Sequence, residues 1–351
     1  MKWEDNVRKV VPYVPGEQPK KRDIIKLNTN ECPYPPAPAV EKALKTCDWA
    51  DLRLYPEFPE QTLLAETLAD HYHVKKEQLF IGVGSDDVLS QAFLTFFNSD
   101  KPILFPDITY SFYDVWADLY RIPYKRQPLD EEFRIRKEDY MAENGGIVFP
   151  NPNAPTGVLM PVEEIEEIVA ANRDVVVIID EAYIDFGGIS CLPLVEKYEN
   201  LLVVQTFSKS RAMAGSRIGY AIGSEKLIRY LNDVKYSVNS YTMNRPALSL
   251  GVASVKDDAY FKEICGKIIN TRERSAAELA ALGFRFPKSY ANFLFVTHER
   301  VPAGEIFTRL KENDIYVRHW EKERIGNYLR ITIGTDEQMD ALIAALKKIL
   351  Q

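Results

Sequence analysis

Two unbroken apolar runs, each leading into reactive side chains, constrain the fold of this 351-residue chain more than any other feature. Val175–Ile179 runs directly into Asp180, and Leu201–Val204 continues through a short polar stretch to Lys209. Uninterrupted runs of Val, Ile and Leu suit strands that are buried on both faces of a parallel sheet. Ligands bind such sheets beyond the carboxyl ends of the strands, so we expect an acid and an amine in one crevice.

Residues 79 to 209 alternate short apolar segments with helical patterns. We expect strands at Leu79–Val83, Ile103–Phe105 and Gly146–Phe149, and helices that begin at Asp86, Tyr110 and Val162. Alternation of strands and helices predicts an α/β fold, in which a mostly parallel sheet is flanked by helices.

The segment before this region is rich in proline, with nine prolines in the first 60 residues. Proline fixes φ and has no backbone donor, so we expect an extended arm there. Helical patterns follow at Ala39–Thr46 and Thr62–His71.

The pattern changes again near Asn244, where one long helical stretch runs toward Leu282 and Gly283 has the place of a C-cap. After it we expect strands at Asn292–Val296, Ile315–Val317 and Tyr328–Ile333, and helices at Ala303–Asn313 and Asp336–Leu350. We therefore predict an N-terminal arm (1–30) that associates with the small domain, a large domain (31–243), and an interdomain helix with a smaller α+β domain (244–351). The crevice between the two domains is the expected pocket.

Composition favours an ordinary cytoplasmic protein. The 44 basic and 51 acidic residues give a net charge of −7, spread along the chain, which disfavours nucleic-acid or membrane partners. The four cysteines are widely spaced and predict reduced thiols rather than disulfides. The polar start does not resemble a signal peptide, and no apolar stretch is long enough for a membrane helix.

Asp180, Tyr183 and Lys209 form the first chemical constellation. Each has an ordinary explanation alone: a capping acid, a packed ring and a surface lysine. Together they need partners, because burying an isolated charge is costly. Pyridoxal 5′-phosphate supplies one for each, with an aldehyde for Lys209, a pyridine nitrogen for Asp180 and a phenolic oxygen for Tyr183.

A second group of residues suits the phosphate of that cofactor. Thr206 and Ser208 flank the lysine with hydroxyls, and Arg217 adds a guanidinium that can bind a dianion. Gly82–Asp86 joins a strand to a helix whose free N–H groups can face an anion. The segment lacks the third glycine of a dinucleotide fingerprint and a Walker lysine, so a phosphate monoester fits better than NAD or ATP.

These pieces together resemble the fold-type I aminotransferases that depend on pyridoxal phosphate, and most closely the histidinol-phosphate aminotransferase family. The likeness covers nearly the whole chain in order. It is carried by Leu27–Glu31, Tyr55–Pro56, Gly84–Asp87, Asp107–Tyr110, Asn153–Gly157, Asp180–Tyr183, Thr206–Lys209, Ser216–Gly219, Ala291–Phe293 and Leu329–Thr335.

The resemblance implies a role for each matched residue. Lys209 forms the internal aldimine and moves the proton between Cα and the cofactor carbon, with Asp180 and Tyr183 as its catalytic companions. The cofactor-binding set is completed by Tyr110, which stacks on the ring, and by Ser85, Asp86, Thr206, Ser208 and Arg217 around the phosphate. Tyr55 reaches the cofactor phosphate of a neighbouring subunit, so the resemblance implies a homodimer.

One position departs from the family pattern. The family often has asparagine directly before Pro-Thr-Gly, bonded to the phenolic oxygen of the cofactor, whereas this chain has Ala154. We expect Asn153 to take over that bond. Asp107 and Ile108 also differ from the commoner lead-in to Tyr110.

The substrate residues follow from the same likeness. Arg318 and Arg330 match the family's substrate arginines, whose planar fork binds phosphate and carboxylate alike. Tyr13, Asn30, Asn239 and Asn292 are expected to line the pocket, and the arm that carries Tyr13 is a possible lid.

The implied activity is a ping-pong transamination of L-histidinol phosphate with 2-oxoglutarate, which gives imidazole-acetol phosphate and L-glutamate in histidine biosynthesis. Two alternatives on the same scaffold are an aromatic or broad-specificity aminotransferase and a threonine-phosphate decarboxylase. A non-catalytic ligand-binding protein is the alternative of another class, because fold alone does not fix function.

Overall fold

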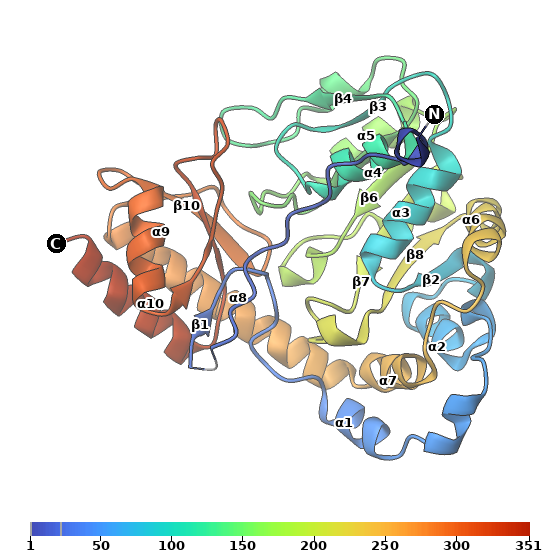
Figure 1. Cartoon of the computed structure of the whole chain (residues 1–351), viewed down its shortest axis with the longest axis horizontal. Helices are drawn as coiled ribbons and strands as arrows, with labels where there is room; N and C mark the ends of the chain where they lie inside the picture. Colours follow the sequence, from blue (N-terminus) through green and yellow to red (C-terminus); the bar gives the residue numbers. More distant parts are fainter. Residues whose placement is uncertain (1, 22) are drawn as a thin grey trace.

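The computed structural model describes residues 2–21 and 23–351, and its centre is a seven-stranded sheet in the order β2-β8-β7-β6-β5-β3-β4 (Figure 1). The strands are β2 (Leu79–Gly82), β3 (Ile103–Pro106), β4 (Tyr124–Gln127), β5 (Ile147–Pro150), β6 (Val177–Asp180), β7 (Leu201–Thr206) and β8 (Gly219–Gly223). All neighbours are parallel except β8, which runs antiparallel to both β7 and β2. The predicted α/β class with a mostly parallel sheet is confirmed.

Helices cover both faces of this sheet, which explains the unbroken apolar runs. Alternate residues of one strand point to opposite faces, so Val177 and Ile179 join the core under one helical layer and Ile178 joins the other. The first layer consists of α2 (Leu63–Tyr72), α5 (Val162–Ala171) and α7 (Arg245–Lys256). The second consists of α3 (Ser85–Phe96), α4 (Phe112–Tyr120) and α6 (Glu225–Val238).

The C-terminal part is built on a smaller antiparallel sheet in the order β12-β13-β10-β9. Its strands are β9 (Phe284–Arg285), β10 (Phe293–His298), β12 (Arg318–His319) and β13 (Leu329–Thr332), packed with α9 (Ala303–Glu312) and α10 (Asp336–Ile349). The arm strand β1 (Ile25–Lys26) pairs in parallel with β11 (Ile315–Tyr316). This pairing supports an arm that belongs with the small sheet, and the domain boundaries themselves stay a prediction.

The helical stretch after Asn244 is two helices, not the single one expected. It breaks at Asp257 between α7 and α8 (Asp258–Ala281), where the Asp257 carboxylate accepts a hydrogen bond from the Tyr260 N–H at 3.4 Å. Gly283 follows α8 with φ +88°, as expected of a helix end. In Figure 1, α8 runs from the large sheet to the small one. Within the described ranges, no helix is both long and apolar enough to span a bilayer.

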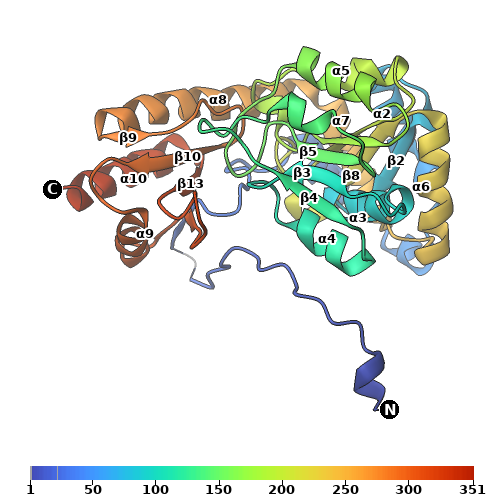
Figure 2. The same cartoon turned by 90° about the horizontal axis from the view of Figure 1, so that it is seen from above.

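The arm is extended, as its prolines predict. Residues 8–21 form no helix or strand, and Figure 2 shows the chain projecting from the body toward its N-terminus. The arm contacts helices of both domains. Arg8 donates to the carbonyl of Leu119, near the end of α4, and Glu17 forms an ion pair with Lys311 of α9 at 2.8 Å.

The remaining elements are short. Helix α1 spans Pro38–Lys45, and 3-10 turns span Trp3–Asn6, Trp49–Arg53, Pro59–Gln61, Lys76–Gln78, Lys137–Tyr140, Ile184–Phe186, Leu192–Glu196 and Ala214–Ser216.

Candidate active site

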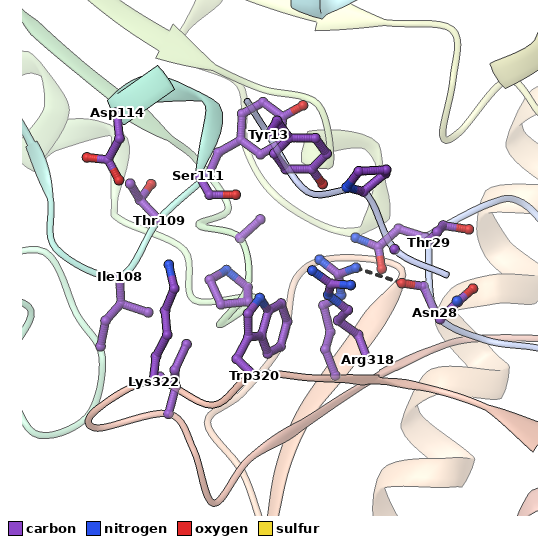
Figure 3. A pocket seen from close by; sticks show the side chains of 18 of the residues that line it. Tyr13, Asn28, Thr29, Ile108, Thr109, Ser111, Asp114, Arg318, Trp320 and Lys322 are labelled. Atoms are coloured by element: carbon purple, nitrogen blue, oxygen red, sulfur yellow. Dashed lines mark hydrogen bonds between the residues drawn. The ribbon is translucent and has the colours of Figure 1, made fainter. Parts of the chain in front are cut away.

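A cavity of about 580 Å³ lies where the large sheet, the small sheet and the arm meet. The large domain contributes Tyr110, Tyr183 and Lys209 to its wall, and the small sheet contributes Arg318 and Arg330. Figure 3 shows Tyr13 of the arm facing Arg318 and Trp320 across the opening. The predicted interdomain crevice is therefore lined by part of the predicted set: Tyr13, Asn30, Tyr110, Tyr183, Lys209, Arg318 and Arg330. The predicted residues Ser85, Asp86, Asp180, Thr206, Ser208 and Arg217 are not part of its wall.

Asp180 ends β6 as a buried carboxylate. It accepts hydrogen bonds from the Ala182 N–H at 3.1 Å and the Tyr113 hydroxyl at 3.3 Å. Burial raises its pKa to about 7. The described part of the chain offers Asp180 no ion pair, so its anion would be stabilised by a cationic group held against it.

Lys209 and Tyr183 face each other at the adjoining strand ends. The Lys209 Nζ lies 5.7 Å from the centre of the Tyr183 ring and donates to the Thr29 carbonyl at 3.3 Å. The Tyr183 hydroxyl accepts a hydrogen bond from the Asn30 side chain at 2.9 Å. Asn30 is itself fixed by Thr332 and Asn292, so the amine and the phenol are held by the arm and the small sheet together.

A cluster of donors forms beside Lys209, at the end of β7. The Thr206 hydroxyl lies 3.0 Å from the Ser208 hydroxyl, which accepts from the Arg217 guanidinium at 3.4 Å. Arg217 also pairs with Asp86 at 3.2 Å, and the Tyr110 hydroxyl donates to the same carboxylate at 2.7 Å. These residues link the cavity wall to the N-terminus of α3, where Ser85 is the first helical residue.

Two glycines make this convergence possible. Gly84 has φ +84°, and a Cβ built there would lie 2.4 Å from the Arg217 guanidinium. A Cβ on Gly219 of β8 would lie 2.2 Å from the Ser85 nitrogen. Since α3 has no side-chain cap, its N–H groups, two hydroxyls and a guanidinium form a concave site for an anion such as a phosphate.

Arg330 and Arg318 present two cations on the opposite wall. Arg330 donates to the Asn28 carbonyl at 3.0 Å, and its Nε is buried without a hydrogen-bond partner. Loss of solvent lowers the pKa of Arg330 from its ordinary value. Neither arginine forms an ion pair with a carboxylate among residues 2–21 and 23–351, which leaves both available to an anionic ligand.

Asn153 does not face the cavity in the way we expected. Its side-chain amide donates to the Ile108 carbonyl and the Thr156 hydroxyl, each at 3.0 Å, and its oxygen accepts from Thr109 at 3.1 Å. These bonds hold the loop together and use both N–H groups, so the geometry counts against Asn153 as a donor to the cofactor. Ala154 lines the cavity instead.

Of the residues predicted to bind substrate or to reach a neighbouring cofactor, three do not line the cavity of this chain. Asn292 lies one layer behind it and donates to the Asn30 carbonyl at 3.0 Å. Asn239 is exposed at the end of α6, where its oxygen accepts from the Tyr241 N–H at 3.3 Å. Tyr55 is 76% exposed and stacks on Tyr241 with ring centroids 4.6 Å apart.

Sequence reasoning also missed residues that the structure brings to the site. Tyr113 lies in the first turn of α4 and its hydroxyl reaches Asp180, a contact between distant segments that no local spacing reveals. Trp320 lies two residues after Arg318, on the same side of an extended segment. Thr29 contributes only its backbone carbonyl, which no side-chain pattern reveals.

The comparisons with known proteins agree with this arrangement. The sequence profile described as "Aminotransferase class I and II" matches residues 22–346. The chain belongs to this family of aminotransferases.

More closely related proteins narrow the assignment. A histidinol-phosphate aminotransferase of Lactococcus lactis subsp. cremoris (strain MG1363) is 52% identical over 351 residues, covering 100% of this chain and 98% of the relative. One from Clostridium beijerinckii is 50% identical, covering 99% and 97%. Within the class, the chain belongs to the histidinol-phosphate aminotransferases.

A solved structure supports the fold. The histidinol-phosphate aminotransferase of Sinorhizobium meliloti, in complex with pyridoxal 5′-phosphate, matches with a TM-score of 0.86 and 25% identity. The match covers 94% of this chain and 92% of that one. The predicted fold-type I architecture is confirmed.

Proposed function

We propose that this protein uses pyridoxal 5′-phosphate to transfer the amino group of L-histidinol phosphate to 2-oxoglutarate, a step of histidine biosynthesis. The products are imidazole-acetol phosphate and L-glutamate. The observation that supports this proposal is a single cavity lined by Lys209, Tyr183 and two arginines, Arg318 and Arg330. Within the described residues, neither of these arginines forms an ion pair with a carboxylate. Identity of about 50% to histidinol-phosphate aminotransferases over the full chain supports the choice of substrate.

The residues present fit the cofactor. The buried Asp180 suits a protonated pyridine nitrogen, which would replace the solvation that the carboxylate lacks. The concave site at Gly84, with Ser85, Asp86, Thr206, Ser208 and Arg217, suits a phosphate monoester. Tyr183 suits the phenolic oxygen, and Tyr110 at the cavity wall suits the ring face.

The cofactor, when bound, supplies an aldehyde that bonds amines reversibly and a ring that accepts the electron pair of a carbanion. With the cofactor bound, the Nζ of Lys209 would accept the proton from the substrate Cα and would donate it to the cofactor carbon that carries the amino nitrogen. The Thr29 carbonyl, 3.3 Å from that Nζ, orients the amine. Asp180 would hold the pyridine nitrogen and keep it protonated through the negative charge of its carboxylate.

The opposite wall selects the substrates. Histidinol phosphate and glutamate both carry an anionic group remote from the reacting amine. Arg330 and Arg318 can bind either group through their planar guanidinium forks. Tyr13, which stacks on Phe112 with centroids 4.1 Å apart, covers this end of the cavity from the arm.

The active unit is a homodimer in this proposal. Tyr55, the residue expected to reach the neighbouring cofactor phosphate, stacks on the exposed Tyr241. Other exposed apolar side chains belong to the same stretch of the chain; they are Trp49, Leu52, Leu54 and Leu63. Exposed apolar residues in one region mark an interaction surface. Tyr55 stacks on Tyr241 of this surface, and its side chain is exposed enough to enter the active site of a partner subunit.

Product analysis tests the proposed reaction. The purified protein, supplied with pyridoxal phosphate and 2-oxoglutarate, is given histidinol phosphate, phenylalanine or threonine phosphate in turn. We expect glutamate to accumulate fastest with histidinol phosphate. A faster reaction with phenylalanine would instead indicate an aromatic aminotransferase, and carbon dioxide release from threonine phosphate would indicate a decarboxylase.

A further inference from the structure

The two arginines of the substrate wall are direct cross-strand neighbours. Arg318 of β12 pairs with Arg330 of β13 in the antiparallel register of the small sheet. Like charges directly opposite each other in a sheet are destabilising. The two neighbouring guanidiniums therefore need a stabilising contact that offsets their repulsion when no anion is bound.

Trp320 provides this support. The Arg318 guanidinium lies 5.5 Å from the centre of its indole ring, and the Arg330 guanidinium lies 5.4 Å from the same ring. Both distances are within the range of a cation–π interaction, for which an indole is the best aromatic partner. Figure 3 shows Trp320 and Arg318 side by side, both directed into the cavity.

The two arginines differ in how much they depend on the indole. Arg330 has two further contacts, a hydrogen bond to the Asn28 carbonyl at 3.0 Å and the Phe293 ring at 5.3 Å. Arg318 has no hydrogen bond or ion pair from its guanidinium to any residue that the structure describes. Removing the indole should therefore release Arg318 and leave Arg330 largely in place.

We infer that Trp320 is a positioning residue that holds Arg318 beside Arg330, and so makes the wall selective for a dianionic phosphate over a carboxylate. A phosphate dianion has the charge and the oxygens to engage both guanidiniums, whereas a carboxylate is satisfied by the fork of one. This inference rests on the proposed function, because it assigns the phosphate of histidinol phosphate to the arginine pair.

Two substitutions distinguish the effect of the aromatic face of Trp320 from the effect of its apolar volume. Trp320→Phe keeps a π face, whereas Trp320→Leu keeps apolar volume against Phe295, whose ring centroid lies 6.4 Å from the indole. Tyr328→Leu is the matched control, since Tyr328 stacks on the same Phe295 with ring centroids 4.5 Å apart and, within the described part of the chain, contacts neither guanidinium. The KM for histidinol phosphate and the KM for glutamate are measured for each holoenzyme.

We expect Trp320→Leu to raise the KM for histidinol phosphate by about 3- to 30-fold and the KM for glutamate by less than about 3-fold. Trp320→Phe should stay within about 3-fold of the unsubstituted enzyme for both, and Tyr328→Leu should leave the ratio of the two KM values unchanged. Equal changes in both KM values, or the same result for the Leu and Phe variants, would overturn the inference.

A binding measurement separates this inference from the proposed reaction. Inorganic phosphate is titrated into each holoenzyme without amino donor, and its binding is followed by phosphorus NMR. Weaker phosphate binding by Trp320→Leu than by Trp320→Phe is expected even if histidinol phosphate proves not to be the substrate. Equal phosphate binding by both variants would contradict the role of the indole, whatever the enzyme turns over.

Discussion

At the scale of single residues, Lys209 is the side chain on which the proposed chemistry depends. Lys209→Ala removes the amine that would transfer the substrate Cα proton, so we expect turnover to fall by about 10²- to 10⁴-fold. Steady-state assays with saturating cofactor and both substrates measure this loss. Lys226→Ala, an exposed lysine on α6, is the matched control and should keep full activity. Substantial turnover by Lys209→Ala would rule out the assigned role.

Asp180 predicts how the stability of the cofactor-free protein depends on pH. Its pKa of about 7 in the folded state lies above the ordinary value of 3.8. At pH values between 3.8 and about 7, Asp180 is therefore more protonated in the folded protein than in the unfolded chain. The free energy of unfolding should therefore fall as the pH rises through this window, by at most about 1.4 kcal/mol per pH unit from this group.

Asp180→Asn removes this contribution and serves as the comparison. Urea unfolding of both cofactor-free proteins at about pH 5 and about pH 8 measures it. We expect the unsubstituted protein to lose more stability than the variant on going to the higher pH. Parallel losses in the two proteins would show that Asp180 is not the buried titrating group.

Asn153 should contribute to the folding stability of the protein rather than to the binding of the cofactor. Its three side-chain hydrogen bonds lie inside the loop, so Asn153→Ala should lower the free energy of unfolding by about 1–3 kcal/mol. The absorption maximum of the bound cofactor should not move. A shifted maximum with unchanged stability would instead restore the bond to the cofactor that the sequence first suggested.

At the scale of elements, the close approach of β8 to the start of α3 forms the anion site. Gly219→Ala would force a Cβ to within 2.2 Å of the Ser85 nitrogen, and the neighbour is backbone that cannot move aside. We expect at least about tenfold weaker cofactor binding, measured by equilibrium dialysis. Gly266→Ala on α8, where a Cβ meets nothing within 4 Å, should bind normally.

The same element shows what sequence patterns can and cannot reveal. The runs that became β6 and β7 were identifiable because strands buried on both faces are continuously apolar. Strand β8 was not predicted, because Gly219–Gly223 has glycine at both ends and only a short apolar stretch between them. The break at Asp257 was also missed, since the apolar pattern continues on both sides of it and only the Asp257 capping bond marks the new helix.

The site could be predicted in part for a related reason. Lys209 and Tyr183 were predicted because they follow recognisable strands, whereas Arg318 and Arg330 were predicted from the family resemblance alone; all four line the cavity. The prediction for Asn153 is not supported by the structure, since its side-chain hydrogen bonds to Ile108 and Thr156 come from loop packing that the sequence does not reveal. The role of Trp320 depends on a cross-strand register that the sequence does not specify.

At the scale of the whole molecule, the proposed homodimer can be tested by mixing defective subunits. Lys209→Ala and Tyr55→Ala chains are each expected to be weakly active alone. If Tyr55 serves the neighbouring site, a refolded equal mixture contains hybrid dimers with one complete site, which should restore about a quarter of full activity. No recovery in a mixture shown to form hybrids would place Tyr55 outside the partner's site.

In the proposed function, one cavity joins the cofactor chemistry of Lys209 to recognition of histidinol phosphate. The most direct measurement follows the absorption band of the lysine-bound cofactor after addition of L-histidinol phosphate alone. We expect conversion to the pyridoxamine form, reversed by 2-oxoglutarate. A cofactor band that does not respond to histidinol phosphate would contradict the substrate, and absence of any such band would contradict the assignment of Lys209.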